Sequence, residues 1–106
     1  MQEYNDYVVS QWGRDKGTAA AALRSPSDHL LIMTNGLAGE TGEILERVKE
    51  YVRNGKPIDE KFLIQCGDAL HYIVRLANHF GFTLPQIVDS NVRKLDARYG
   101  GRKPTP

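Results

Sequence analysis

A periodic run of apolar residues between positions 59 and 80 constrains the fold of this chain more than any other feature. Its members are separated by three, four, three, four and three residues, which is the spacing of one face of an α-helix. They are Leu63, Cys66, Leu70, Ile73, Ala77 and Phe80. We therefore predict a helix from about Asp59 to Phe80, with this apolar stripe facing the core.

A second long helix is predicted from Ser27 or Asp28, either of which is a good N-cap, to about Arg53. The sequence Asn54-Gly55-Lys56-Pro57 that follows is a stop and turn signal. Apolar residues again recur every three or four positions, now with Thr41 in one gap. They are Leu30, Met33, Leu37, Ile44, Val48 and Tyr51.

Three glycines in this second segment, Gly36, Gly39 and Gly42, leave two interpretations open. Each helical glycine costs about 1 kcal/mol relative to alanine, so each needs a reason. One reason is the close approach of another backbone or of a ligand. The alternative is that Asn35-Gly36 breaks the helix and that the stretch after it is a loop.

Two shorter helices complete an all-α prediction. The first runs from about Gln2 to Trp12 and is followed by a loop over residues 13–25. The last is capped by Thr83, carries Pro85 in its first turn and ends near Tyr99. Residues 1–99 form one domain, and residues 100–106 are expected to be a flexible tail.

The lengths of the two central helices predict self-association. At 1.5 Å per residue, antiparallel helices of about 22 and 26 residues span roughly 33–39 Å. One short and one medium helix do not cover both of them. We therefore expect a dimer, or a tetramer built as a dimer of dimers, in which a second copy completes a helical bundle.

Composition excludes several classes of partner. The net charge of the 106-residue chain is +1, so no broad field favours nucleic acid or a membrane surface. Cys66 is the single cysteine, which excludes an intrachain disulfide. No apolar run approaches the roughly 20 residues of a membrane span, and the N-terminus has no signal-peptide pattern. A cytoplasmic location is the default expectation.

Two short polar pairs on the central helices indicate a metal site. Glu40 and Glu43 are separated by three residues, as are Gln65 and Asp68, so each pair shares one helix face. Two antiparallel helices can aim four oxygen ligands at one point. Such ligands suit Mg²⁺, with Mn²⁺ also possible, and Mg²⁺ keeps waters that a phosphate can replace.

Further polar residues are candidates for binding a polyphosphate and a base. Asn91, Lys94 and Arg98 share one face of the last helix and can hold phosphates from the side opposite the metal. Lys49, near the end of the second helix, can serve the same purpose. Tyr72, next to His71, is a candidate for lining a base pocket.

Together these segments resemble the MazG-type members of the all-α nucleoside triphosphate pyrophosphohydrolase superfamily. The family pattern is Glu-x-x-Glu followed, after a spacer, by Glu-x-x-Asp. The resemblance covers about residues 28 to 99. The matching text is Leu37-Ala38-Gly39-Glu40-Thr41-Gly42-Glu43-Ile44, Gly67-Asp68-Ala69-Leu70-His71-Tyr72 and Asn91-x-x-Lys94-Leu95-x-x-Arg98-Tyr99.

The resemblance implies Mg²⁺-dependent hydrolysis of (deoxy)nucleoside triphosphates to monophosphate and pyrophosphate. Glu40, Glu43 and Asp68 would be metal ligands, with Glu40 or Glu43 also acting on the attacking water. Gln65 stands where the family has its third acid. Another acid compensates, with Glu46 or Glu50 as candidates, or the chain is naturally inactive, or Gln65 is an engineered Glu→Gln change.

Two other functions remain open at this point. One is a related enzyme of the same superfamily, such as a phosphoribosyl-ATP pyrophosphohydrolase. The other is a non-catalytic helical dimer that binds a nucleotide or a protein partner, for which Gln65 is the main support.

Overall fold

The chain folds into four helices in a computed structural model that describes residues 1–16 and 26–100. In chain order they are α1 (Gln2–Lys16), α3 (Pro26–Asn54), α4 (Glu60–His79) and α5 (Leu84–Tyr99). No strand occurs among the described residues. The all-α prediction is therefore confirmed. Most of the predicted loop, at residues 17–25, and the predicted tail, at residues 101–106, lie outside the described residues.

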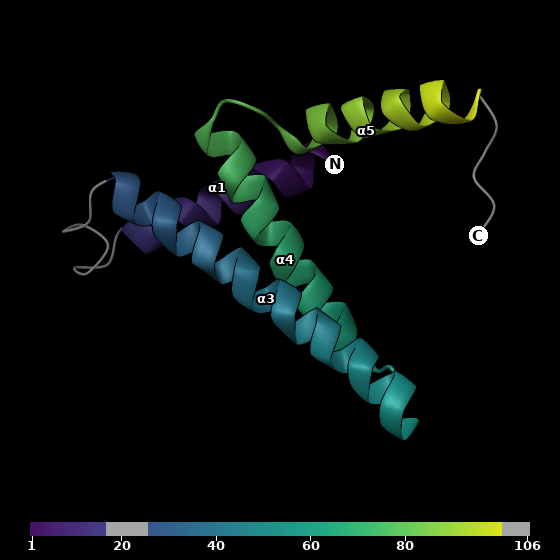
Figure 1. Cartoon of the computed structure of the whole chain (residues 1–106). Helices are drawn as coiled ribbons and strands as arrows, with labels where there is room; N and C mark the ends of the chain where they lie inside the picture. Colours follow the sequence, from purple (N-terminus) through teal and green to yellow (C-terminus); the bar gives the residue numbers. More distant parts are fainter. Residues whose placement is uncertain (17–25, 101–106) are drawn as a thin grey trace.

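The helices α3 and α4 form an antiparallel hairpin, with α1 crossing it near the end away from the turn (Figure 1). Helix α3 is continuous through Asn35 and Gly36, so the loop interpretation is wrong. The predicted turn follows Asn54, and Gly55 adopts a positive φ of 65°. Asp59 then caps α4 by accepting a hydrogen bond from the backbone N–H of Lys61 at 3.0 Å.

Helix α1 is longer than the sequence predicted. It continues past Trp12 to Lys16, so residues 13–16 are helical rather than part of a loop. A single glycine at position 13 costs only about 1 kcal/mol in a helix. That penalty does not stop a helix whose next residues are compatible with it. The correction moves the end of α1 by about one turn.

The core lies where α1, α4 and α5 meet. Val8, Val74 and Leu84 are its buried members, and Tyr4 and Val88 pack against them. Thr83 forms the predicted cap of α5 as a complete capping box with Gln86. Only the beginning of α5 belongs to this core, and the helix then leads away from α4 (Figure 1).

A buried asparagine joins three of the helices at this core. Asn5 of α1 is 3% exposed. Its Oδ1 accepts hydrogen bonds from Asn78 Nδ2 of α4 at 2.8 Å and from the backbone N–H of Leu84 at 2.9 Å. Its Nδ2 donates to Asn78 Oδ1 at 3.3 Å. Asn5 thus satisfies the first N–H of α5, a group that helix geometry leaves without a partner.

The apolar stripe of α4 does not face the core of the single chain, which corrects the sequence prediction. Leu63 is 69% exposed, and Leu70 and Ile73 are 38% and 39% exposed. Helix α4 instead meets α3 through the neighbouring polar stripe that contains Gln65, which is buried. Periodicity identifies a face that avoids water, but it does not say which partner covers that face.

None of the helices in the described part of the chain combines the length and the apolar character that crossing a membrane requires.

Candidate functional site

The facing sides of α3 and α4 form a small open pocket of about 290 Å³. Glu40 lines it from α3, and Asp68, His71 and Tyr72 line it from α4. The sequence predicted that carboxylates from the two helices would converge here. In this pocket one carboxylate from each helix does so, together with two aromatic rings.

Gly36 allows Tyr72 to lie against α3. A Cβ on residue 36 would overlap the Tyr72 ring. The ring also makes an edge-on contact with His71, with centroids 5.7 Å apart and planes at 88°. The close approach of the Tyr72 ring therefore explains the glycine at position 36, as the first of the two interpretations predicted. It does not explain Gly39 or Gly42, where a Cβ would meet nothing within 4 Å.

The Glu40 carboxylate lies in an unfavourable environment for a negative charge. Its Oε2 is buried and has no hydrogen-bond partner among the described residues. Partial burial, and then the negative charges of Glu43 and Asp68, raise the pKa of Glu40 above its ordinary value. The three carboxylates are thus close enough to interact. A cation or a bound proton would relieve their repulsion.

Gln65 is hydrogen-bonded to one of these acids. Its Nε2 donates to Glu43 Oε2 at 3.1 Å. A carboxylate at position 65 would place a further negative charge at that contact, whereas the amide donates to Glu43. Gln65 Oε1 is buried and has no hydrogen-bond partner among the described residues. The amide oxygen therefore has an unused hydrogen-bonding capacity, although Gln65 is not among the residues that line the pocket.

The oxygen donors of this region fit a divalent cation that also binds a phosphate. Within the described residues, no group of three or more His, Cys, Asp and Glu side chains is assembled to hold a metal. Mg²⁺ does not need such a cage, because it commonly takes one or two carboxylates and fills its other positions with water and phosphate. Glu40 and Asp68 supply two carboxylates, and the Gln65 amide oxygen lacks a partner.

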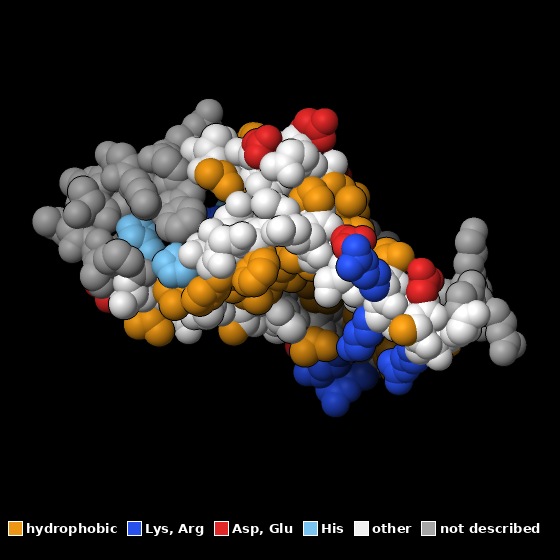
Figure 2. All heavy atoms as spheres, turned by 90° about the horizontal axis from the view of Figure 1, so that it is seen from above, with side chains coloured by type: hydrophobic (Ala, Val, Ile, Leu, Met, Phe, Trp, Pro, Cys, Tyr) orange, Lys and Arg blue, Asp and Glu red, His pale blue; other side chains and the backbone are white. Residues whose placement is uncertain are grey.

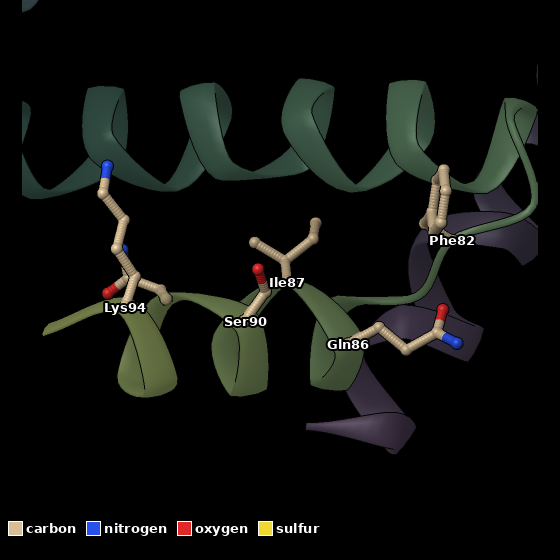
Figure 3. Close-up of a pocket in the computed structure, with 6 residues that line it drawn as sticks. Phe82, Gln86, Ile87, Ser90 and Lys94 are labelled. Atoms are coloured by element: carbon tan, nitrogen blue, oxygen red, sulfur yellow. The ribbon is translucent and has the colours of Figure 1, made fainter. Parts of the chain in front are cut away.

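The predicted phosphate-binding residues of α5 lie in a different pocket. Asn91 and Lys94 line a cavity of about 500 Å³ with Phe82, Gln86, Ile87 and Ser90. Lys94, Ile87 and Phe82 extend to the same side of α5 (Figure 3). Arg98, farther along α5, is exposed, and its guanidinium carbon lies 5.9 Å from the centroid of the Tyr99 ring. Neither Asn91 nor Lys94 lines the acidic pocket.

Lys49 and the proposed compensating acids also lie away from the pocket. Lys49 follows Glu40 by nine residues, which places it half a turn around α3, and its Nζ pairs with Glu46 at 3.6 Å. Glu50 pairs with Lys56 at 3.1 Å. It lies about 15 Å along the helix from Glu40 at 1.5 Å per residue. Each of these side chains is thus paired with an opposite charge outside the pocket.

Three residues that shape this architecture, namely Asn5, Phe82 and Ile87, were not identified from the sequence. Asn5 carried no signal, because an isolated asparagine in a predicted helix does not reveal the partners that it meets 73 and 79 residues later. Phe82 and Ile87 were not expected to line a cavity with Lys94. The apolar spacing of α5 was the available signal, but it did not show that this part of the helix lacks cover in the single chain.

Comparison with known proteins shows that the sequence is similar to that of a phage protein. It is 31% identical over 74 residues to the Gene 37 protein of Mycobacterium phage L5. The aligned part is 65% of this chain and 65% of the phage protein, slightly less than two thirds of its length. No protein-family model and no solved structure matches the chain. The name of the phage protein states no activity, so the function is inferred from the pocket.

Proposed function

We propose that the chain is a MazG-like, Mg²⁺-dependent pyrophosphohydrolase of (deoxy)nucleoside triphosphates that acts in the cytoplasm. The observation that carries this proposal is the pocket that Glu40 and Asp68 line from opposite helices. Burial, and then the negative charges of Glu43 and Asp68, raise the pKa of Glu40, so positive charge in the pocket would stabilise its ionised form. The rings of Tyr72 and His71 on the same pocket offer apolar and aromatic surface to a nucleoside.

In the proposed reaction, water attacks the α-phosphorus and a P–O bond forms. The bond from the α-phosphorus to the oxygen that bridges to the β-phosphorus breaks, and that oxygen leaves with pyrophosphate. Bound Mg²⁺ would neutralise charge on the phosphate oxygens. Glu40 accepts the proton of the attacking water, a role that suits a carboxylate whose pKa is raised above its ordinary value, because such a group holds a proton more readily. Gln65 keeps Glu43 in place through their hydrogen bond.

The proposed phosphate-binding role of the α5 residues requires a second copy of the chain. Asn91 and Lys94 line a separate cavity in the single chain. Their predicted role in holding phosphates therefore requires α5 to meet the acidic pocket of another copy. Arg98 and Lys49 are exposed, and a role for them in binding phosphates likewise requires the pocket of another copy. The acidic pocket itself does not depend on them.

Gln65 supports a second candidate function, which is nucleotide binding without turnover. The hydrogen bond from Gln65 to Glu43 occupies one oxygen of a carboxylate that the resemblance assigns to the metal. Replacing a charged ligand with a neutral amide also weakens Mg²⁺ binding. A chain of this kind binds a nucleotide and turns it over slowly or not at all.

Pyrophosphate release separates these functions. The chain and its Gln65→Glu variant are incubated with Mg²⁺ and a panel of ribo- and deoxynucleoside triphosphates, with phosphoribosyl-ATP included. Activity in both proteins on a nucleoside triphosphate supports the enzyme and shows that Gln65 is sufficient. Activity only in Gln65→Glu means that position 65 limits an otherwise intact site. No activity in either, with nucleotide binding retained, establishes the binding function, and turnover of phosphoribosyl-ATP alone establishes the related enzyme.

A further inference from the structure

Arg47 is a cation on the side of α3 that faces α4. It follows Glu43 by four residues and Glu40 by seven, so the three side chains share one face of α3. The structure shows that this face meets α4. Glu40 lines the pocket with Asp68 of α4. Glu43 accepts a hydrogen bond from Gln65 of the same helix. Arg47 therefore continues the line of the pocket toward the turn of the hairpin.

The guanidinium of Arg47 has hydrogen-bonding capacity that the described residues do not use. Its Nε is buried and has no hydrogen-bond partner among them. Its Nη1 lies 4.0 Å from Glu50 Oε2, which is longer than the roughly 2.7–2.9 Å of a charge-assisted hydrogen bond. Glu50 has a closer partner in Lys56, whose Nζ lies 3.1 Å from the same oxygen. Arg47 can therefore turn its planar fork of donors to another anion without leaving Glu50 unpaired.

Aromatic, acidic and basic side chains follow one another along the facing sides of α3 and α4. The Tyr72 ring lies against Gly36. The carboxylates of Glu40 and Asp68 come next along the hairpin. At 1.5 Å per residue, Glu40 is about 6 Å farther along α3 than Gly36, and Arg47 is roughly 10 Å beyond Glu40. A nucleoside triphosphate has the same order of groups, namely a base, the α-phosphate that water attacks, and the β- and γ-phosphates.

Helix geometry allows the guanidinium of Arg47 to reach back toward the pocket. Each Cα–Cβ bond of a helix is tilted toward the N-terminus, so a long side chain can cover the turn that precedes its own residue. For Arg47 that turn carries Glu43, which lies between Arg47 and Glu40. Most Lys and Arg side chains seen from above also lie on the half of the molecule that contains the turn, and the histidines lie on the other half (Figure 2). A polyphosphate that extends from the pocket toward the turn therefore approaches positive charge.

We propose that Arg47 binds the β- and γ-phosphates that leave as pyrophosphate. The substrate then lies along the hairpin, with its base at Tyr72 and its terminal phosphate toward the turn. This inference rests on the proposed function and specifies how that site holds its substrate.

The proposed contact stabilises the leaving group. As the bond from the α-phosphorus breaks, negative charge develops on the oxygen that leaves with pyrophosphate. The guanidinium of Arg47 gives up its long contact with Glu50 and donates hydrogen bonds to the leaving phosphates. Arg47 belongs to the same chain as the acidic pocket, so this interaction needs no second copy, whereas the proposed role of Lys94 does.

Binding of inorganic pyrophosphate tests this inference without turnover and without knowledge of the preferred base. Isothermal titration calorimetry measures its Kd in the presence of Mg²⁺ for the chain and for its variants. Arg47→Gln removes the charge and the planar fork, so the Kd rises at least about 10-fold, as expected for the loss of hydrogen bonds between charged groups. Arg47→Lys keeps the charge and restores part of the affinity. Arg53→Gln removes the same charge from an exposed position in the last turn of α3 and changes the Kd less than about twofold, because solvent and salt screen that charge.

A variant of the neighbouring acid covers the case in which Arg47→Gln does not fold. Glu50→Gln removes the carboxylate that competes for Arg47, so pyrophosphate binds about twofold more tightly. Glu46→Gln removes the same charge from a glutamate that pairs with Lys49 and leaves the Kd unchanged. Equal effects of these two variants overturn the inference.

The remaining outcomes separate this inference from the proposed function. No pyrophosphate binding to the unchanged chain, or an equal Kd for it and folded Arg47→Gln, overturns the role of Arg47. Turnover of a nucleoside triphosphate with the same kcat and KM in Arg47→Gln overturns that role as well and keeps the proposed function. Pyrophosphate binding that depends on Arg47, without turnover of any nucleoside triphosphate, supports the binding site and overturns the proposed hydrolysis instead.

Discussion

The two sides of the α3–α4 hairpin carry opposite chemistry on the same pair of helices. One side holds Glu40, Asp68 and a small aromatic pocket. The side turned away from the pocket is mainly apolar, with Leu63 and Leu70 exposed in the single chain. The comparison teaches that one pair of helices can keep polar and apolar chemistry on separate sides, so the ligand binding that we propose for one side does not depend on what lies against the other. Each side can be altered without touching the other.

The largest expected effect comes from removing the pocket charge. Glu40→Gln keeps the shape of the side chain but loses the proposed proton acceptor, so turnover falls at least about 100-fold. Pyrophosphate release measures this loss. The mass in light scattering stays that of the unchanged chain, because Glu40 lies on the polar side of the hairpin.

The matched control for this variant is Glu46→Gln. Glu46 is an exposed glutamate of the same helix, and it pairs with Lys49 rather than lining the pocket. The Glu46→Gln variant should retain full turnover. Equal activity in Glu40→Gln and the unchanged chain would remove Glu40 from the mechanism and leave the pocket without its proposed role.

A smaller effect is expected on stability, where substitution of Gly36 should differ from substitution of Gly42. Gly36→Ala forces a Cβ into the Tyr72 ring, and such overpacking costs about 1–3 kcal/mol, only partly offset by the gain in helix propensity of about 1 kcal/mol. Gly42→Ala meets open space and gains only the propensity. Urea unfolding should therefore show a loss of stability for the first variant and a gain for the second.

The outcome also bears on the pocket, because Tyr72 is displaced only in Gly36→Ala. That variant should weaken nucleotide binding, whereas Gly42→Ala should not. If both variants gain stability by the same amount, Tyr72 does not lie against Gly36 as described.

The smallest expected effect is a pH dependence that Glu40 creates when chelator removes divalent cations. Its pKa is raised in the folded chain, so its contribution to stability is greatest below the unfolded value of about 4.5 and is lost as the pH rises through the folded pKa. The Glu40→Gln variant does not lose stability in this way, because its amide does not ionise. The thermal midpoint of the variant minus that of the unchanged chain should increase from pH 4 to pH 7.

Addition of Mg²⁺ should reverse this difference at neutral pH, because a ligand that binds only the folded chain with an ionised Glu40 stabilises it. A difference that stays flat with pH in chelator would mean that neither burial nor the charges of Glu43 and Asp68 raise the pKa of Glu40.

Most of the fold could be predicted because its signals are local. Apolar spacing located α3 and α4, and Thr83 with Pro85 located the start of α5. The orientation of α4 could not be predicted in the same way. Its strongest apolar stripe, which includes Leu70, was expected in the core of the single chain and is exposed. Spacing along one helix carries no information on the helix that lies beside it.

The acidic pocket was partly predictable for the same reason. Glu40 and Asp68 have the spacing that shares one helix face with Glu43 and Gln65, and both line the pocket. The hydrogen bond between Gln65 and Glu43 depends on side-chain conformations that spacing does not determine. The position of Lys94 could not be predicted either, since it depends on the direction in which α5 leaves the hairpin.

The Asn5 contact has a consequence for how the chain folds. The α3–α4 hairpin joins segments connected by a short turn and can form early, since local contacts close at little entropic cost. Asn5 instead meets Asn78 and Leu84, 73 and 79 residues farther along. During synthesis α1 therefore leaves the ribosome long before its partners exist, and Val8 stays exposed until α4 and the start of α5 have emerged. Docking of the first helix is then the last step, and it orients the last helix at the same moment.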